Sequence, residues 1–179
     1  MTLKFGGERI ELFGYAGRIL QVDLTTGRIW TEPLSEEYAR KYIGGIGLGM
    51  RLFLDNSKPG VDPFDPENPL VLATGPLSGT MWPTGGNGHA FVSKSPQSFG
   101  IGESKSHGSF GAELKRAGYD AVIFKGRAEK PVYVWIDDES IQLMDASHLW
   151  GKSPSETEDT IKEEPVSYTH LTLPTTERV

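Results

Sequence analysis

The first regular pattern in the chain is an alternation of apolar and polar side chains at residues 19–24. Its apolar positions include Leu20, Val22 and Leu24, and its polar positions are Gln21 and Asp23. A period of two is typical of a half-buried strand. A Thr-Thr-Gly turn follows at 25–27, and glycine adopts the left-handed conformation of such a turn at little cost. We therefore predict a hairpin whose second strand spans 28–31.

Helical spacing begins at Ser35. Serine is a typical helix N-cap, and Glu36 and Glu37 lie in the first turn, where the helix dipole favours negative charge. Apolar residues then recur on one helical face, at Tyr38, Ala39, Tyr42 and Ile43. The pair Gly44-Gly45 is predicted to end this helix. A second helix is predicted from about Leu48 to Leu54.

Short apolar runs and turn-rich stretches share the rest of the chain. Proline, glycine and serine predict loops at 58–69, 74–88 and 99–109. Strands are predicted at 70–73, 90–94, 121–125, 132–136 and 141–143. Helices are predicted at 110–117 and 153–164, the second opened by a full capping box. This mixture favours an α+β fold rather than a helical bundle.

A hairpin followed by a serine-capped helix occurs twice, near residues 19–43 and near 132–164. The repetition indicates an internal duplication, although this order of elements is also common in α+β domains. Residues 165–179, PVSYTHLTLPTTERV, lack a helical period and introduce a proline into the last helix. We interpret them as a non-native tail that resembles translated adapter or vector DNA, with a natural flexible tail as the alternative.

The composition narrows the functional classes. The chain has 179 residues, a net charge of -6 and no cysteine. An acidic chain does not suit sequence-independent binding to nucleic acid. Without cysteine this segment has neither disulfides nor thiolate metal sites. It shows no secretory signal pattern and no apolar run long enough to span a bilayer. We therefore predict a soluble, cytoplasmic protein that binds neither nucleic acid nor a membrane.

Three glycine-rich segments, residues 44–49, 74–88 and 100–109, are the candidate ligand sites. Glycine lets backbone N–H groups approach an anion closely, and a following helix N-terminus adds further donors. For each segment, a tight turn in a compact domain is the alternative. No Walker-type, Rossmann or nucleophile-elbow motif accompanies them. The residues alone therefore predict no more than a phosphate-like ligand.

Histidines and carboxylates near these segments show no catalytic pattern. His89, His107 and His148 are far apart in the sequence and lack metal-ligand spacing. We interpret His148 as a packed or capping residue. Glu113 and Asp120 are the carboxylates nearest the segments, and we expect each to form a salt bridge or face solvent.

Four ordered segments carry a more specific signal. They are GYAGRIL with DLTTG, ATGPLSGT, FGAELKRAGYDA, and AEKPVY followed by DASHLWGK. In this order and spacing they resemble the N-terminal domain of the aldehyde ferredoxin oxidoreductases. The resemblance runs from about Phe13 to Glu164. It divides the chain into an extension at 1–12, a pterin-binding domain at 13–164 that is truncated at its C-terminal end, and the tail at 165–179.

Several expectations rest on the resemblance alone. It implies two β-sheets that form the base for a tungsten or molybdenum bis-pterin. It also implies a magnesium ion bridging the pterin phosphates, and a [4Fe-4S] cluster bound by domains that this chain lacks. The implied reaction oxidises an aldehyde with water to a carboxylic acid and passes electrons to ferredoxin or another electron-transfer protein. A homo-oligomer is an open alternative, and the fragment alone is expected to be inactive.

The resemblance also assigns cofactor contacts to the three glycine-rich segments. The expected binding residues are Gly45, Gly47, Thr84, Gly85, Gly86, Asn87, Gly88, Lys105, Ser106, His107 and Gly108. The main-chain carbonyl of Lys105 is the expected magnesium ligand. No catalytic residue is expected, because the family's acid and base residues belong to later domains.

Three positions depart from the family pattern. Many members have arginine where this chain has Ile46, and arginine directly after the second glycine pair, where it reads Asn87-Gly88. Lys105 stands in place of the usual asparagine. Fewer arginines mean fewer bidentate donors for phosphate, so the substrate is left open. The alternatives are a relative that reduces an aromatic coenzyme A thioester, and a non-catalytic module that binds a pterin or nucleotide.

Overall fold

The structure is a computed structural model that describes residues 2–5, 8–11, 13–82, 87–137, 140–163 and 171–174. Residues 2–11 and 171–174 are described by their backbone only. The chain divides into two compact units, Met1–Arg127 and Ala128–Val179. Each unit has its own sheet and its own buried core.

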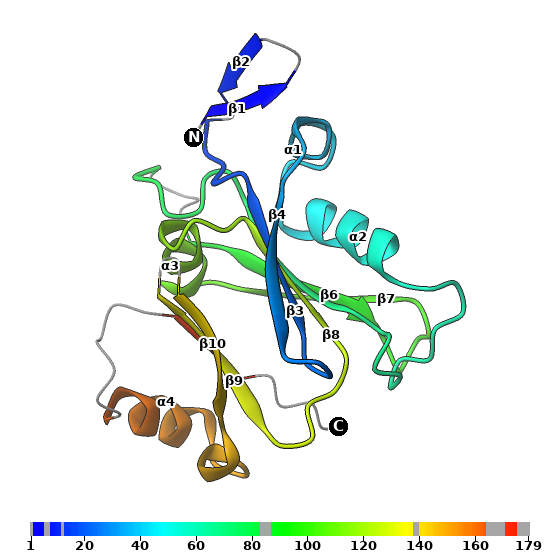
Figure 1. Cartoon of the computed structure of the whole chain (residues 1–179), viewed down its shortest axis with the longest axis vertical. Coiled ribbons are helices and arrows are strands. Elements are labelled where there is room, and N and C mark those ends of the chain that lie inside the picture. Colours follow the sequence, from blue (N-terminus) through cyan, green and yellow to red (C-terminus); the bar gives the residue numbers. More distant parts are fainter. Residues whose placement is uncertain are drawn as a thin grey trace. The chain divides into compact units, whose positions relative to one another are not determined.

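A mixed six-stranded sheet is the framework of the first unit (Figure 1). Its spatial order is β4-β3-β8-β5-β6-β7, and its strands are β3 (Arg18–Asp23), β4 (Arg28–Pro33), β5 (Leu70–Thr74), β6 (His89–Lys94), β7 (Ile101–Ser106) and β8 (Ala121–Lys125). β3 and β8 are parallel, and the other neighbouring pairs are antiparallel. A separate antiparallel hairpin is formed by β1 (Thr2–Phe5) and β2 (Glu8–Glu11).

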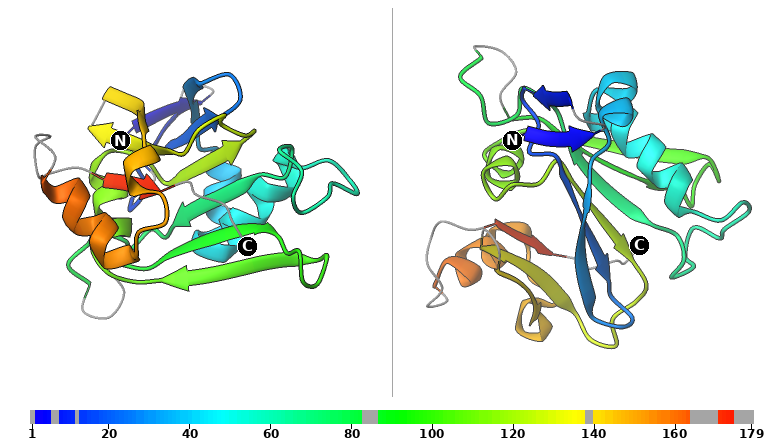
Figure 2. Two further views of the ribbon diagram at one scale, coloured as in Figure 1. Left: turned by 90° about the horizontal axis from the view of Figure 1, so that it is seen from below. Right: turned by 45° about the horizontal axis from the view of Figure 1, so that its top comes forward.

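The helices assigned in the described part of the first unit are α1 (Glu36–Tyr42), α2 (Gly45–Asn56) and α3 (Phe110–Arg116). Figure 2 shows α2 lying along one face of the sheet, where it packs on β5 and β6. Leu48 and Leu52 of α2 are buried in one cluster with Val71, Ala73 and Val92 of these strands. Burial of this apolar face fixes α2 over the middle of the sheet.

The second unit is built around β9 (Val132–Asp137). β9 pairs antiparallel with β10 (Ser140–Asp145) and with β11 (Leu171–Pro174). A short 3-10 helix, η1 (Ser147–Leu149), and the helix α4 (Pro154–Glu163) follow β10. One buried cluster of this unit contains Tyr133, Trp135, Ala146 and Leu149, with Met144 and Ile161 packed against it.

The predicted α+β fold with short helices is confirmed. Apart from the β1–β2 hairpin, the strands form two sheets, as the family resemblance implies. Ser35 caps α1 by accepting a hydrogen bond from the Tyr38 N–H (3.1 Å). The capping box of α4 is also present, because the Ser153 N–H donates to Glu156 Oε2 (2.8 Å). The two hairpins have different neighbours: β3 has a parallel partner, whereas both partners of β9 in the described part of the chain are antiparallel. The internal duplication stays a prediction.

Two of the predicted loops contain regular structure. α2 begins at Gly45 rather than near Leu48, so the first glycine-rich segment is mostly helix. A Cβ atom at Gly49 would lie 2.8 Å from Val92 Cγ2, which shows that close packing on β6 accounts for this glycine. The third segment contains the edge strand β7. Its side chains are almost all exposed, so no alternation revealed it, and backbone pairing with β6 defines the strand instead.

The prediction that β3 is buried on one face only is wrong. Residues Ile19 to Val22 are all buried, including Gln21 at 5% exposure. β3 lies inside the sheet between β4 and β8, and it has a parallel partner, a setting in which strands are usually covered on both faces. The Gln21 amide is tolerated there because its Nε2 donates to Glu32 Oε2 (3.1 Å) on the neighbouring strand.

Candidate functional site

The segment between β5 and β6 forms the centre of the candidate site. The Ser78 hydroxyl accepts a hydrogen bond from the Gly75 N–H (3.1 Å) and donates one to the Gly88 carbonyl (2.9 Å). Ser78 is only 4% exposed, so its hydroxyl takes the place of water as a partner for both backbone groups. One buried side chain therefore joins the two ends of the second glycine-rich segment. No pattern in the sequence points to Ser78.

The first glycine-rich segment lies directly against the second. A Cβ atom at Gly44 would lie 2.7 Å from the Gly75 Cα atom and 2.7 Å from the Thr74 carbonyl oxygen. Both opposing groups are backbone, so neither can rotate away as a flexible side chain would. The backbone of Gly44 is extended, with φ near 175°. Glycine is therefore required at this position for the close approach of two backbones and not for its dihedral freedom.

The third segment reaches the second through β6 and β7. In the register of these strands, His89 lies opposite Ser106. Beyond the strand ends, a Cβ atom at Gly88 would lie 3.5 Å from the His107 ring. Contacts therefore run without interruption from Gly44, through the second segment, to His107. The three segments adjoin one another and are not scattered over the first unit.

The described cofactor residues of the prediction occupy four positions in the fold. Gly45 and Gly47 lie in the first turn of α2, Asn87 and Gly88 in the turn before β6, Lys105 and Ser106 at the end of β7, and His107 and Gly108 directly after it. Thr84, Gly85 and Gly86 lie outside the described residues. The structure thus brings the described members together, and their role in cofactor binding stays a prediction.

Two of these glycines have an unobstructed backbone. Gly45 (φ 52°) and Gly108 (φ 110°) are left-handed, and apart from chain neighbours and the helix's own backbone, no atom of the described residues lies within 4 Å of the position of a Cβ at either residue. Gly47 is different, because a Cβ atom there would lie 2.6 Å from the Tyr42 carbonyl oxygen. Packing within the fold accounts for Gly47, whereas Gly45 and Gly108 leave room for a ligand to approach the main chain.

A buried ion pair holds the turn before β3 against this region. Asp120 is 1% exposed and accepts hydrogen bonds from the N–H groups of Ala16 (3.1 Å) and Gly17 (2.6 Å). Lys115 forms a salt bridge with Asp120 and also donates to the Gly14 carbonyl (2.6 Å). The expectation of a salt bridge at Asp120 is confirmed, and Glu113 likewise pairs with a neighbouring arginine.

Tyr15 extends this network to the first glycine-rich segment. Its hydroxyl donates to the carbonyls of Ala39 (3.0 Å) and Ile43 (2.7 Å) at the end of α1. The Lys115 ammonium lies 5.4 Å from the centre of the Tyr15 ring. Burial, and next the negative charge of Asp120, raise the pKa of Tyr15 above its usual value. The phenol therefore stays protonated and available as a donor at neutral pH.

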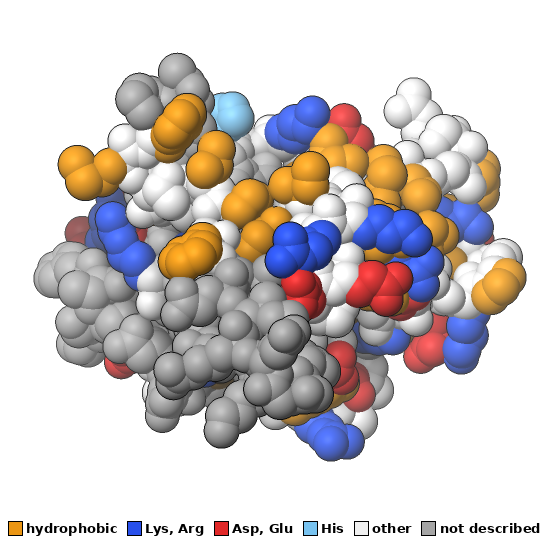
Figure 3. Space-filling view, turned by 90° about the horizontal axis from the view of Figure 1, so that it is seen from above, with side chains coloured by type: hydrophobic (Ala, Val, Ile, Leu, Met, Phe, Trp, Pro, Cys, Tyr) orange, Lys and Arg blue, Asp and Glu red, His pale blue; other side chains and the backbone are white. Residues whose placement is uncertain are grey.

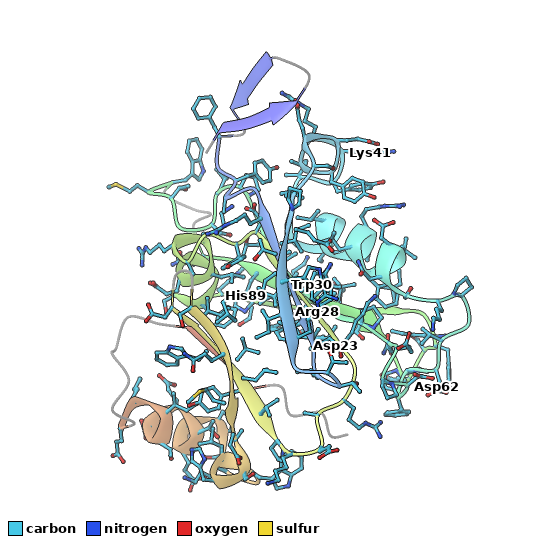
Figure 4. The ribbon with its side chains drawn as sticks, viewed as in Figure 1. Asp23, Arg28, Trp30, Lys41, Asp62 and His89 are labelled. Carbon is cyan, nitrogen blue, oxygen red and sulfur yellow. The ribbon has the colours of Figure 1, made fainter. Side chains whose placement is uncertain are left out.

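Among the described residues of this region, His89 has a buried ring nitrogen without a hydrogen-bond partner. It is 8% exposed, and its Nδ1 atom is buried without a hydrogen-bond partner. Its ring packs on Phe110 (4.8 Å between centroids) and Phe91 (5.8 Å), which places it beside α3 (Figure 4). Sequence spacing set His89 apart from His107, but the pairing of β6 with β7 brings them into the same region.

The pKa of His89 is lowered from its ordinary value of 6.5, first by burial and also by the nearby His107, while the backbone of Asn87 acts in the opposite direction. The folded state therefore favours the neutral imidazole. Below pH 6.5 the unfolded chain binds a proton that folded His89 resists. The stability that neutral His89 contributes is present above pH 6.5. It decreases as the pH falls from 6.5 toward the pKa of His89 in the folded chain.

We expect the free energy of unfolding to decrease between about pH 7 and about pH 5, and to decrease less in His89→Gln. Urea denaturation at several pH values measures this difference. His107→Gln is the matched control, because His107 is exposed and its loss removes only a neighbouring positive charge. An identical pH dependence in the native chain and in His89→Gln would show that burial of His89 does not govern this acid response.

Removal of the Ser78 hydroxyl is expected to loosen the second segment. Ser78→Ala leaves the Gly75 N–H and the Gly88 carbonyl without their present partner. We expect a loss of about 1–2 kcal/mol in the free energy of unfolding. Faster amide exchange at Gly75 would accompany it. Ser98→Ala, in an exposed turn, is the control and should change stability by less than about 0.5 kcal/mol.

Comparison with known proteins shows the family of this chain. The family model described as "Aldehyde ferredoxin oxidoreductase, N-terminal domain" matches residues 19–173. The chain belongs to the aldehyde ferredoxin oxidoreductase family. The "Tungsten-containing aldehyde ferredoxin oxidoreductase" of Pyrococcus furiosus is 52% identical over 153 residues, which cover 86% of this chain and 25% of that protein. The protein of the same name from Pyrococcus abyssi is 51% identical over the same coverage.

This member of the family is also similar to a solved structure. This is the "Active site complex BamBC of Benzoyl Coenzyme A reductase in complex with 1,5 Dienoyl-CoA", with a TM-score of 0.82 and 39% identity. The match covers 85% of this chain and 23% of that one. This chain thus spans about a quarter of the length of these curated relatives and of the solved chain.

Two features of this family member fit a bound anionic cofactor. Gly45 and Gly108 present left-handed backbone with free space beside it, which suits the approach of phosphate to main-chain N–H groups. The unpartnered Nδ1 of His89 adds a polar atom in the same region. Among the residues that the structure describes, no group of three or more His, Cys, Asp and Glu side chains could hold a metal ion. None of the described helices is both long and apolar enough to cross a membrane.

Proposed function

We propose that this chain is the cofactor-supporting N-terminal part of an enzyme that oxidises aldehydes to carboxylic acids. The balanced reaction consumes one aldehyde and one water, and releases a carboxylic acid, two electrons and two protons. The observation that carries the proposal is the identity of 52% to a tungsten-containing aldehyde ferredoxin oxidoreductase over 86% of this chain. Ferredoxin as the electron acceptor and a cytoplasmic location belong to the same proposal.

The proposed role of this chain is to hold the cofactor by its backbone. A tungsten or molybdenum bis-pterin, when bound, supplies the two-electron redox centre. Gly45 and Gly108 would offer main-chain contacts from the first and third segments, where their backbone is unobstructed. Ser78 would keep the second segment in shape between them. Asn87 and Gly88, with Thr84 to Gly86, would add further contacts to the cofactor from the second segment.

Magnesium and an iron–sulfur cluster are separate parts of the proposal. The main-chain carbonyl of Lys105 would bind magnesium, a role that does not depend on the side chain at this position. Thiolate ligands for a [4Fe-4S] cluster would come from outside this chain, since it contains no cysteine. Lys105 is exposed and would supply one positive charge where the family's frequent arginines are replaced by Ile46 and Asn87-Gly88.

The proposal is tested in an intact chimera. Residues 13–163 of this chain replace the matched quarter of the Pyrococcus furiosus protein, and the purified chimera is assayed for tungsten and for aldehyde oxidation with a viologen dye. We expect bound tungsten and turnover in the chimera. We expect neither in the isolated chain, and turnover by that chain alone would contradict the proposal. A folded chimera without tungsten would contradict the cofactor-supporting role.

Reduction of an aromatic coenzyme A thioester is the second candidate. It is favoured by the similarity to a benzoyl coenzyme A reductase structure at a TM-score of 0.82. The lack of arginine at Ile46 and at Asn87-Gly88 is consistent with a divergent substrate. Assay of the same chimera with benzoyl coenzyme A and a low-potential donor separates the two reactions.

A further inference from the structure

The chain contains three asparagines, Asn56, Asn68 and Asn87. Asparagine is chemically labile, because the backbone nitrogen of the next residue can attack its side-chain amide carbon, Cγ, and expel ammonia. The reaction requires an available N–H on the next residue and a side-chain amide that can turn toward it. These two requirements separate the three asparagines in this structure.

Asn56, the last residue of α2, is restrained at both positions. Its Nδ2 atom donates a hydrogen bond to the Leu52 carbonyl (2.9 Å). The attacking nitrogen would be that of Ser57, and its N–H donates to the Phe53 carbonyl (2.8 Å) as the cap of the helix. Both hydrogen bonds must break before the nitrogen can reach Cγ, so the folded chain protects this residue.

Asn68 is protected by the covalent structure of the chain. The next residue is Pro69, whose nitrogen carries no hydrogen. The side chain is also held, because its Nδ2 donates to the Pro63 carbonyl (2.8 Å) and its Oδ1 accepts from the Lys94 N–H (3.3 Å). Asn68 therefore cannot lose ammonia by this route in the folded or the unfolded chain.

Asn87 has neither form of protection. Its side chain is exposed, and in the described part of the chain no hydrogen bond holds its amide or the Gly88 N–H. Gly88 has no Cβ atom to hinder the attack, and its backbone adapts easily to ring closure. The reacting groups are thus available, although the Gly88 carbonyl beside them is held by Ser78 (2.9 Å).

We propose that Asn87 is a site of spontaneous deamidation in the folded protein. The Gly88 nitrogen forms a bond to Asn87 Cγ, the bond from Cγ to Nδ2 breaks, and the proton of the Gly88 N–H passes through solvent to the leaving ammonia. Water then opens the cyclic imide at one of its two carbonyls, which gives aspartate or isoaspartate at position 87. One water is consumed and one ammonia is released, without oxidation or reduction.

The isoaspartate product would disturb the second glycine-rich segment. Its main chain runs through the former side chain, so it is longer by one methylene, and the original carbonyl of residue 87 becomes a carboxylate. Both carbonyls lie against α3, because a Cβ atom at Gly111 would lie 3.3 Å from the Asn87 oxygen and 3.2 Å from the Gly88 oxygen. Lengthening at this point weakens the link through Ser78, so we expect faster amide exchange at Gly75, whose N–H donates to Ser78.

Incubation of the 179-residue chain at mildly alkaline pH, followed by peptide mass spectrometry, measures the rate at each asparagine. We expect Asn87 to convert about tenfold or more faster than Asn56, and Asn68 to stay unconverted. Figure 3 shows exposed charged side chains of both signs on one face of the molecule. One further carboxylate on a chain of net charge -6 allows ion-exchange chromatography to separate the converted form.

Gly88→Ala is the matched variant. A Cβ atom at this position would lie 3.5 Å from the His107 ring, which is an ordinary contact, so we expect the fold to be kept. The methyl group hinders the attack, and conversion of Asn87 should become slower by about fivefold or more. In concentrated urea the helix cap is lost, so Asn56 should convert faster while Asn68 still does not.

Equal conversion of Asn56 and Asn87 in the folded chain would overturn the inference. So would a rate at Asn87 that Gly88→Ala leaves unchanged, because the attack of the Gly88 nitrogen would then not be the limiting step. Unchanged amide exchange at Gly75 in the purified isoaspartate form would overturn the expected effect on the second segment.

Conversion at Asn87 also bears on cofactor binding, and this step alone rests on the proposed function. A carboxylate at position 87 would repel an anionic ligand held by the second segment. In the chimera described above, we expect Asn87→Asp to retain less tungsten than the uncharged Asn87→Ser, by about threefold or more. Equal tungsten in the two variants would overturn this step. A chimera that binds no tungsten even with Asn87 intact would contradict the proposed function, whereas the conversion rates of the isolated chain would still decide whether Asn87 deamidates.

Discussion

Asp120→Asn is expected to be the most destabilising of the substitutions considered, with a loss of about 3–5 kcal/mol in the free energy of unfolding. The carboxylate is 1% exposed, accepts N–H groups from Ala16 and Gly17, and pairs with Lys115, whose side chain is 10% exposed. An asparagine side chain offers one acceptor oxygen where two N–H donors converge, and it leaves the lysine charge uncompensated. Urea denaturation followed by circular dichroism measures the loss.

Two variants show whether burial is responsible for this effect. Lys115→Met leaves Asp120 with both of its backbone donors, so we expect a smaller loss, about 1–3 kcal/mol. Glu67→Gln breaks the exposed pair with Lys58, where both side chains are more than half exposed, and should change stability by less than about 1 kcal/mol. If Asp120→Asn and Glu67→Gln lowered the free energy of unfolding equally, burial of Asp120 would not explain its contribution to stability.

Local signals in the sequence were sufficient for most elements of the fold. The cap at Ser35 and the capping box at Ser153 each act within a few residues, and both are present as predicted. The hairpin turn is also present, but it includes Leu24 and so has four residues rather than three. Such signals depend on the backbone groups nearest to them, which the sequence itself places. This is why hairpins and helix starts near these residues were predictable.

Contacts between distant segments were not predictable in the same way. The strand β7 exists because β6 pairs with it, and its own side chains are almost all exposed. The hydrogen bond from the Ala16 N–H to Asp120 joins residues that are 104 positions apart. The glycine at position 49 is explained by its close packing against Val92. In each case the deciding interaction is tertiary, and propensity gives no sign of it.

The candidate site also combines features that the sequence indicates with features that only tertiary contacts reveal. Glycine content indicated three segments that adjoin one another in the structure, and their role as ligand sites stays a prediction. It could not distinguish a glycine needed for packing from one with open space beside it. Gly47 belongs to the first kind, and Gly45 and Gly108 to the second. Ser78 was not singled out, and His89 was noted only as a histidine without metal-ligand spacing, because one polar residue in a loop or strand has no pattern. Only the closed loop and the buried ring reveal them.

Gly44→Ala is the second substitution with a large expected effect. Its methyl group would lie 2.7 Å from the Gly75 Cα atom and from the Thr74 carbonyl, so the first and second segments must separate. Overpacking of this kind typically costs about 1–3 kcal/mol, and we expect the upper part of that range because both opposing groups are backbone. Urea denaturation of the isolated chain measures it.

The same variant in the chimera should bind markedly less tungsten, because separation of the segments spoils the arrangement proposed to hold the cofactor. For stability alone, Gly45→Ala is the matched control: its backbone is left-handed, but a Cβ atom there would meet nothing within 4 Å outside its chain neighbours and its own helix. We expect it to lose only about 1 kcal/mol through backbone strain. If Gly44→Ala were no more destabilising than Gly45→Ala, the contact between the two segments would not be what holds them in place. If Gly44→Ala unfolded more easily but kept its tungsten, the first segment would be structural and the cofactor would be held elsewhere.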